Sequence, residues 1–155
     1  MSCACFHVRP MMAADLPAAL ELWRVTEGMG LGESDKPARL AAFLDRNPGL
    51  SAVAELKDGA LVGAVMCGED GRRGYLHHLA VARANRRQGI AQTMVAHCFA
   101  GLAAREIEKC TIFLLADNTE GERFWQRAGW VRRDNLKVMQ KSVAGGAISS
   151  GSCTC

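Results

Sequence analysis

The sequence predicts a mixed α/β fold in which helices cover one central β-sheet. Residues 51–81 contain three strand-like segments separated by turn residues, and strands joined in this way pair antiparallel. A long helical pattern at residues 88–105 leads into a wholly apolar segment, residues 111–116. Strands connected through such a helix pair in parallel, so the sheet is expected to be mixed. We expect a single domain over residues 1–142, followed by a flexible tail at residues 143–155.

The first fifty residues predict one strand and two helices. Residues 6–9 favour a strand, which Pro10 ends. Asp15 is an N-cap candidate for the first helix, because apolar residues recur at helical spacing after it. The second helix is expected to begin near Pro37 and to stop at Asn47. The glycine-rich stretch between the two helices lacks periodicity and predicts a mobile loop.

The remainder of the chain predicts a meander, two further helices and two further strands. An Asp-Gly pair at residues 58–59 is typical of a two-residue hairpin turn, and a looser turn precedes the strand of residues 75–81. The apolar residues 111–116 are typical of a strand buried on both faces of a sheet. A last helix over residues 119–128 is expected to lead into a final strand, residues 130–141.

The bulk composition argues against several classes of protein. A net charge of +3 is too small by itself to indicate binding to nucleic acid or to an anionic membrane. No apolar run approaches the roughly 20 residues that cross a bilayer. The start of the sequence also lacks the features of a signal peptide. We therefore expect a cytoplasmic protein with neither a nucleic-acid nor a membrane partner.

The seven cysteines are expected to be reduced thiols in that compartment. Cys67, Cys98 and Cys110 lie in apolar runs and are predicted to be small core residues. The other four form two Cys-x-Cys pairs, Cys3 with Cys5 and Cys153 with Cys155. Four thiolates could hold zinc if the chain ends met, but a one-residue spacing is uncommon in structural zinc sites. We expect two thiol-bearing tails and no metal.

The segment of residues 79–91 has the pattern of an anion site. A strand ends there, a basic loop turns, and a helix begins near Gln88, so unpaired backbone N–H groups and the helix dipole face one point. Gly89 leaves room for a phosphate, and Arg86 and Arg87 add positive charge. No Lys-Ser/Thr pair follows the glycine, and two glycines of the dinucleotide fingerprint are missing. The pattern therefore predicts a pyrophosphate site of another kind.

These residues resemble the signature of the GCN5-related N-acetyltransferase (GNAT) family, Arg/Gln-x-x-Gly-x-Gly/Ala after a strand that ends in valine. Here that strand ends at Val81 and the signature stands at residues 86–91. The resemblance covers residues 6–142 and includes Arg123-Phe124-Trp125, a little before Gly129. The chain is most similar to the small bacterial acetyltransferases of the family. The resemblance implies a central mixed sheet of about six to seven strands, splayed in the middle and flanked by four helices.

The resemblance also implies a function. A protein of this kind transfers the acetyl group of acetyl-CoA to an amine of a small molecule or peptide, and a homodimer is plausible for it. The alternative is a domain that binds acetyl-CoA as a sensor or partner module without catalysis. The pantetheine arm would lie along the splayed strand and the pyrophosphate on the loop. The expected coenzyme-binding residues are Leu79, Ala80, Val81, Arg86, Arg87, Gln88, Gly89, Ile90, Ala91, Asn118, Phe124 and Trp125.

Acetyl transfer to an ammonium needs a base that removes a proton and an acid for the departing thiolate. His77 and His78 are candidate bases, and strand alternation predicts that their rings point to opposite faces of the sheet. Many family members use a tyrosine of the last helix as acid, where this chain has Trp125. Tyr75, the only tyrosine, is therefore the candidate acid, with water or the substrate as alternatives. We hypothesise that His77 is the proton acceptor, because the arylalkylamine branch carries a histidine at the matching position.

Carboxylates compete with the histidines for the role of base. Glu27, Glu33 and Asp35 lie in or beside the glycine-rich loop, where they could also attract a cationic amine. Glu69 and Asp70 lie at the turn before the candidate catalytic strand. The three loop acids are the expected substrate-binding residues.

Overall fold

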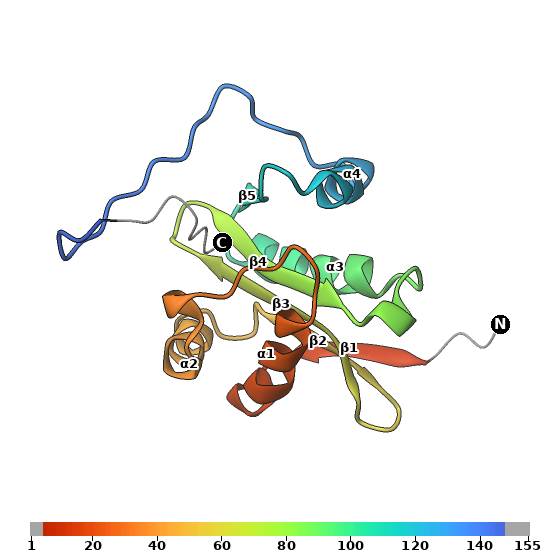
Figure 1. Cartoon of the computed structure of the whole chain (residues 1–155). Coiled ribbons are helices and arrows are strands. Elements are labelled where there is room, and N and C mark those ends of the chain that lie inside the picture. The colour runs from red at the N-terminus through yellow and green to blue at the C-terminus, as the bar shows by residue number, and fades with distance from the viewer. Residues whose placement is uncertain (1–4, 148–155) are drawn as a thin grey trace.

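A computed structural model of the protein describes residues 5–147. A five-stranded sheet has its strands in the order β1-β2-β3-β4-β5 (Figure 1). The strands are β1 (Phe6–Pro10), β2 (Ala52–Leu56), β3 (Leu61–Glu69), β4 (Gly74–Val81) and β5 (Cys110–Ile112). The helices are α1 (Leu16–Arg24), α2 (Pro37–Arg46), α3 (Ile90–Ala104) and α4 (Thr119–Arg127). The first four strands pair antiparallel and β5 pairs parallel to β4, which confirms the predicted mixed sheet.

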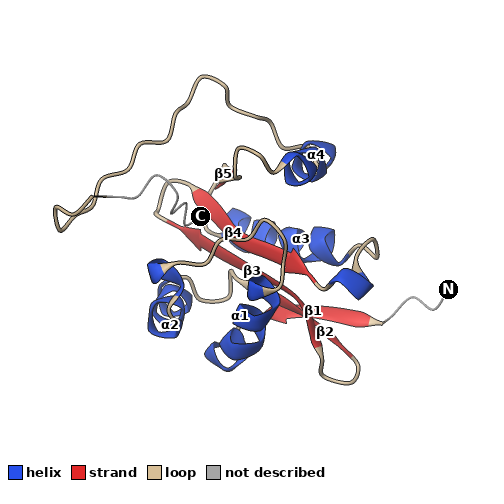
Figure 2. Cartoon of the chain, in the orientation of Figure 1, coloured by secondary structure: helices blue, strands red, loops and turns tan. Residues whose placement is uncertain are grey.

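Helices cover both faces of the sheet, with α1 and α2 on one face and α3 on the other (Figure 2). Trp23 of α1 and Leu44 of α2 pack with Val53 and Met66 of the sheet. On the opposite face, the buried side of α3 packs against the other alternating residues of the same strands. Burial of apolar surface on both faces therefore fixes the orientation of the central strands.

Glycines let α3 approach the sheet closely. A Cβ at Gly74 would lie 2.6 Å from Leu102, and a Cβ at Gly63 would lie 2.9 Å from Met94. Both distances are shorter than a normal contact, so a side chain at either strand position would force the side chains of α3 to shift.

The sheet has fewer strands than the six to seven that the family resemblance implied. The strand expected at residues 111–116 is only three residues long, and Phe113 just after it is 38% exposed rather than buried on both faces. In the described part of the chain, residues 130–141 form no strand and run as an extended segment beyond α4 (Figure 1). Because β5 pairs with β4 through only three residues, its outer edge offers few backbone groups to a sixth strand.

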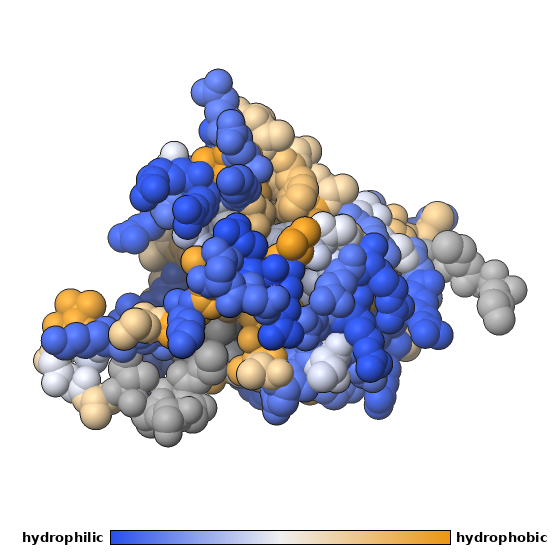
Figure 3. Space-filling view, turned by 90° about the horizontal axis from the view of Figure 1, so that it is seen from above, coloured by the Kyte–Doolittle hydropathy of each residue, from blue (hydrophilic) through white to orange (hydrophobic). Residues whose placement is uncertain are grey.

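The surface seen from above is mainly hydrophilic, with hydrophobic side chains gathered in separate patches (Figure 3). The extended segment after α4 contributes exposed apolar side chains, Leu136, Val138 and Met139 among them. None of the helices in residues 5–147 is both long enough and apolar enough to cross a membrane.

The cysteines of the sheet and of α3 are core residues, as predicted. Cys67 and Cys98 are fully buried, and Cys110 is partly buried. Hydrogen bonding between the Cys67 and Cys98 thiols, together with burial, raises the pKa of Cys67. Burial raises the pKa of Cys110 to about 12, so this thiol stays protonated at neutral pH. Cys5 is exposed, whereas the other members of the terminal pairs, Cys3, Cys153 and Cys155, lie outside the described residues.

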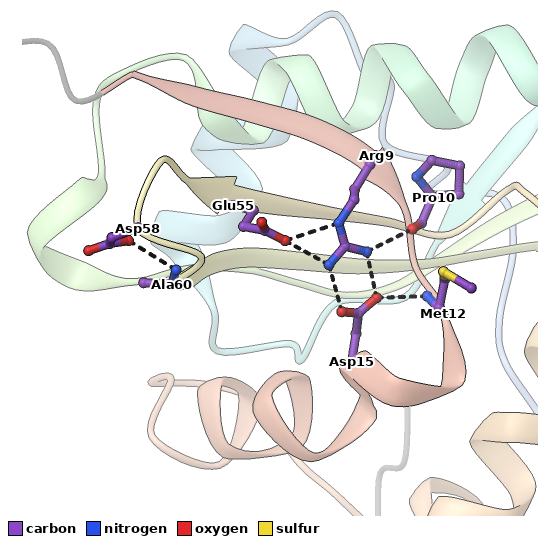
Figure 4. A network of polar contacts seen from close by, with 7 residues as sticks. All are labelled: Arg9, Pro10, Met12, Asp15, Glu55, Asp58 and Ala60. Atoms are coloured by element: carbon purple, nitrogen blue, oxygen red, sulfur yellow. Dashed lines mark hydrogen bonds and ion pairs between the residues drawn. The ribbon is translucent and has the colours of Figure 1, made fainter.

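A partly buried charge network fixes the start of the fold (Figure 4). The Arg9 guanidinium on β1 donates to both oxygens of Asp15, at 2.8 Å each, and to Glu55 on β2 at 2.7 Å. Asp15 also accepts the backbone N–H of Met12 at 2.8 Å, just before α1 begins. One guanidinium thus links two strands to the first helix. The hydrogen bonds from Arg9 hold the pKa of Asp15 below its ordinary value.

We expect Asp15→Asn to lower the free energy of unfolding at pH 7 by about 1 to 3 kcal/mol, because it removes a charge-assisted pair. The pKa of Asp15 is depressed in the folded state, so its contribution is present above the unfolded pKa and is lost as the pH falls through the folded one. Urea unfolding of both proteins should therefore show a difference at pH 7 that shrinks below about pH 4. Glu21→Gln removes the exposed pair with Arg24 and is the control, with an expected loss below about 1 kcal/mol.

Candidate active site

Two cavities meet at β4. The first, which we call the strand cleft, has a volume of about 650 Å³ and lies between β4 on one side and β5 and α4 on the other. The second, the α2 cavity, has a volume of about 610 Å³ and lies between α2, β4 and the chain after β5. His77, His78 and residues 113–115 line both cavities. A group placed at these histidines can therefore face ligands from two sides.

The strand cleft exists because β4 and β5 separate halfway along β4. Their pairing ends at Leu76 and Ile112, so the rest of β4 has no neighbour on that side. The N–H of Ala82 donates to the carbonyl of Val62 on β3 at 2.8 Å. Backbone direction alternates along a strand, so the N–H groups of Leu79 and Val81 point away from β3, into the cleft. These groups can pair with an extended ligand as a further strand would.

A β-bulge at His78 changes which way the side chains of β4 point. His77 pairs with Met66 and Ala80 with Ala64, so two residues of β4 lie opposite Val65 alone. His78 has a φ of +54°, in the left-handed region that residues other than glycine rarely adopt. The predicted alternation of the two rings is therefore wrong, because the extra residue resets the period of two.

Both histidines point to the face that α1 and α2 cover. The His78 ring packs against Trp23 of α1, with 5.2 Å between ring centroids. The His77 ring meets Phe43 of α2 edge-on at 6.0 Å. The next residue, Leu79, points to the opposite face and packs against the core under α3. The bulge therefore places two imidazoles side by side where the cavities meet.

Asp35 holds His78 in this conformation. Its Oδ1 lies 2.7 Å from Nε2 of His78, and its Oδ2 accepts the backbone N–H of Gly32 at 2.8 Å. The side chains are only 8% and 5% exposed, so this is a buried pair. It ties the loop before α2 to the bulge of β4. A left-handed residue costs roughly 1 to 3 kcal/mol, and the pair is well placed to offset that strain.

His77 is left with both ring nitrogens unbonded within the described residues. It lies between Phe43 and Tyr75, whose ring stacks on the imidazole with centroids 6.3 Å apart. Burial, helped by the neighbouring His78, lowers the pKa of His77 below its ordinary value. The ring is therefore neutral at physiological pH and has a nitrogen available to accept a proton.

The third catalytic candidate, Tyr75, lies away from both cavities. Its ring stacks between His77 and Phe113, and its hydroxyl lies 3.4 Å from a carboxylate oxygen of Asp70. It lines neither the strand cleft nor the α2 cavity. In this structure Tyr75 supports the His77 ring rather than facing the cleft.

The basic loop before α3 has the shape of an anion cradle. Arg87 and Gly89 both adopt left-handed φ values, +62° and +80°, which turns successive backbone N–H groups toward one point. Arg86 is held in place, because its Nε donates to the Val81 carbonyl at 3.0 Å and its Nη2 to Glu27 at 3.0 Å. Arg87 is exposed and makes no ion pair with any other described residue. The loop thus offers backbone donors and one uncommitted cation.

The wall opposite β4 comes from α4. Asn118 caps this helix by accepting the N–H of Gly121 at 2.9 Å, and it lines the strand cleft beside Phe124 and Trp125. Trp125 is buried and packs edge-on against Trp130, with ring centroids 4.8 Å apart. The aromatic residues therefore anchor α4 and shape the cleft together.

The family model described as "Acetyltransferase (GNAT) family" matches residues 16–130. The chain belongs to the GNAT family. Acetyl-CoA is accordingly its acetyl donor, and the strand cleft between the parted strands is where its architecture admits an extended ligand.

Named acetyltransferases are among its sequence relatives. One from Yersinia enterocolitica is 30% identical over 137 residues, which are 88% of this chain and 96% of that protein. One from Photorhabdus laumondii is 31% identical and the match covers 72% of this chain and 77% of that protein.

Solved acetyltransferase structures share the fold at low sequence identity. The PaiA N-acetyltransferase from Thermoplasma acidophilum, solved with coenzyme A, has a TM-score of 0.70 at 16% identity, over 80% of this chain and 88% of that chain. Diaminobutyrate acetyltransferase from Paenibacillus lautus, solved with L-2,4-diaminobutyric acid and coenzyme A, has a TM-score of 0.66 at 22% identity. That match covers 81% of this chain and 75% of that chain.

Most residues expected to bind the coenzyme line the strand cleft of this GNAT protein. They are Leu79, Val81, Arg86, Arg87, Gly89, Ile90, Ala91, Asn118, Phe124 and Trp125. Ala80 and Gln88 do not line it. Ala80 is buried under the α1 side, and Gln88 has a buried Oε1 without a hydrogen-bond partner in the described structure.

The three loop acids are dispersed. Glu27 lines the strand cleft and pairs with Arg86, whereas Asp35 lines the α2 cavity and is bound to His78. Glu33 lines neither cavity and pairs with Lys36 at the surface.

Residues 113–115 and Arg123 are parts of the site that the sequence did not indicate. Residues 113–115 line both cavities, because β5 ends early and the chain crosses the gap between them. Their apolar pattern suggested a buried strand instead. Arg123 lines the strand cleft from α4; it belongs to the stretch that carries the family resemblance, but no binding role was predicted for it.

The strand cleft fits coenzyme A on the residues present. It combines an unpaired strand edge at Leu79 and Val81, the left-handed cradle at Arg87 and Gly89, and a volume typical of ligand pockets. The strand edge would hold the pantetheine arm, and the cradle at Arg87 and Gly89 would hold the pyrophosphate. Across residues 5–147, the structure brings together no group of three or more His, Cys, Asp or Glu side chains suited to a metal ion.

We expect Gly89→Ala to raise the Kd for coenzyme A by roughly tenfold or more, because a side chain disfavours the left-handed cradle that presents N–H groups to the pyrophosphate. Isothermal titration calorimetry measures this directly. Gly59→Ala is the matched control: its φ is +87° in the hairpin turn, and a Cβ at either glycine meets nothing within 4 Å. Equal weakening by the two variants would mean that Gly89 acts through stability alone.

Proposed function

We propose that the protein transfers the acetyl group of acetyl-CoA to a primary amine, with His77 as the proton acceptor. The observation that carries this proposal is the place of His77 at the junction of the strand cleft and the α2 cavity, with both ring nitrogens unbonded. The donor would enter through the strand cleft and the amine through the α2 cavity.

The proposed reaction moves two protons, and one C–N bond replaces one C–S bond. The neutral His77 imidazole accepts a proton from the substrate ammonium, directly or through one water, and leaves a nucleophilic amine. The amine nitrogen then forms a bond to the acetyl carbonyl carbon, and the bond from that carbon to sulfur breaks. The acylated nitrogen loses its second proton as the amide forms, and the departing thiolate gains one, either directly from that nitrogen or through solvent, since Tyr75 faces neither cavity.

Backbone groups of β4 are suited to stabilise the developing charge on the carbonyl oxygen. The N–H of Leu79 faces the cleft and keeps a fixed direction, because the neighbouring Ala80 stays paired with β3; the N–H of Val81 remains for the pantetheine arm. The carbonyl of Val81 already accepts a hydrogen bond from Arg86, so the N–H of Val81 is the backbone group of that residue that is left for the ligand. The bulge at His78 sets where these donors point relative to the His77 ring.

The alternative of an acetyl-CoA sensor without catalysis has no specific observation in its favour. A sensor needs only the strand cleft, whereas this protein has a second cavity that meets the cleft at a neutral histidine. A cytoplasmic location and a homodimer stay predictions, which cell fractionation and light scattering test.

We expect His77→Gln to lower kcat/KM at pH 7 by roughly 10²- to 10⁴-fold, the usual contribution of a general base. Because the pKa of His77 is lowered, its basic form dominates from neutral pH upward, and activity should fall on the acid side with an inflection below 6.5. The variant should lack that inflection. Thiol release from acetyl-CoA, measured from pH 5 to 9, reports both effects.

His97→Gln is the matched control for this experiment, since His97 lies on α3 and lines neither cavity. It should keep both the rate and the acid inflection. An inflection that survives in His77→Gln would contradict the assignment of His77 as base.

A further inference from the structure

The α2 cavity, proposed above as the entrance for the amine, has walls that are mostly apolar. The apolar residues that line it are Leu40, Phe43, Met66, Phe113, Leu114, Leu115, Ala116 and Val138. They come from α2, from β3, from the chain after β5 and from the segment after α4. An acceptor that fills this space therefore gains most by burying hydrocarbon surface.

Among the described residues that line the cavity, a single buried carboxylate, at its floor, is available to an ammonium. That carboxylate is Asp35, and both of its oxygens already have partners, His78 on one side and the Gly32 N–H on the other. Among the residues that line the cavity there is no other Asp or Glu. The floor can receive one amine beside His77 and His78, but a second ammonium elsewhere on the substrate would have no counter-charge.

Among the described residues of the same cavity wall, Arg39 is the one Lys or Arg. Arg39 of α2 is exposed and makes no ion pair or side-chain hydrogen bond with any described residue. The nearby Glu33 pairs with Lys36 instead, at the surface. Arg39 precedes Phe43 by four residues, so the two lie on the same face of α2, one turn apart. The guanidinium is thus available to a carboxylate on the substrate.

We propose that the acceptor is an amine that carries both an apolar body and a carboxylate, the chemical class of the apolar amino acids. This inference rests on the proposed function. The amine lies at His77, the apolar body lies against Phe43 and the other cavity walls, and the carboxylate pairs with Arg39. Diamines, polyamines and lysine-rich peptides are poor substrates, because their second ammonium would meet Arg39 and apolar walls.

The test compares an acceptor that has both features with one that lacks the carboxylate and with a diamine that lacks both features and carries a second ammonium. Thiol release from acetyl-CoA is measured with L-phenylalanine, with phenethylamine, which lacks the carboxylate, and with 1,4-diaminobutane, which lacks the apolar body as well. We expect kcat/KM to be highest for phenylalanine, and at least tenfold higher than for the diamine. A preference for the diamine would overturn the inference and leave acetyl transfer to amines intact.

Variants of α2 then assign the carboxylate contact. Arg39→Gln should lower the ratio of kcat/KM for phenylalanine to that for phenethylamine by about 10- to 100-fold, the value of a charge-assisted hydrogen bond. Arg46→Gln, at the exposed end of the same helix and outside both cavities, should leave the ratio unchanged. An unchanged ratio in Arg39→Gln would overturn the role of Arg39.

Acetyl transfer to amines and the choice of acceptor can be contradicted separately. If no amine in a broad panel releases thiol while coenzyme A still binds, the proposed function is wrong and the acceptor class falls with it. If amines react but the carboxylate and the apolar body confer no advantage, only the inference about the acceptor is wrong.

Discussion

The buried contact between His78 and Asp35 is the interaction on which the arrangement of the site depends. It holds a non-glycine residue in a left-handed conformation, and that one residue resets the direction of every side chain after it on β4. Without the extra residue, His77 and His78 would point to opposite faces of the sheet, and only one of them could point to the face that α1 and α2 cover. The same contact anchors the loop that leads into α2. Strand geometry, loop position and the joining of two cavities are thus consequences of one carboxylate.

Much of the fold could be predicted because each element carries a local signal. Proline and turn residues delimit β1 and the β2–β3 hairpin, and helical periodicity marks α3. The length of β5 could not be predicted in this way. Residues 112–116 are apolar throughout, yet most of them line cavities instead of packing in a sheet. Whether an apolar residue faces a core or a ligand is decided by distant parts of the chain. The strand expected at residues 130–141 does not form, because it needed a long strand edge to pair with and the short β5 does not provide one.

In the candidate site, too, features with a local sequence signature could be predicted, and features that depend on distant parts of the chain could not. The basic loop around Gly89 has a local signature, so its residues were found from sequence and most of them line the strand cleft. The β-bulge leaves no mark in the sequence, because a bulge depends on the register of two strands. Sequence alternation therefore gave the wrong face for one histidine. The pairing of Asp35 with His78 joins residues 43 positions apart and could only emerge from the folded chain.

The parting of β4 and β5 also has a mechanical consequence. Three residue pairs connect β5 to the rest of the sheet, and α4 beyond it is held largely by packing of Trp125 and its aromatic neighbours. A ligand that bridges the gap would supply the cross-connections that this end of the sheet lacks. Donor binding should therefore make the C-terminal third of the molecule more resistant to local opening. At a free donor concentration of about one hundred times Kd, binding should raise the free energy of unfolding by about 2.7 kcal/mol. The gap that admits the coenzyme is also what makes the protein's rigidity depend on it.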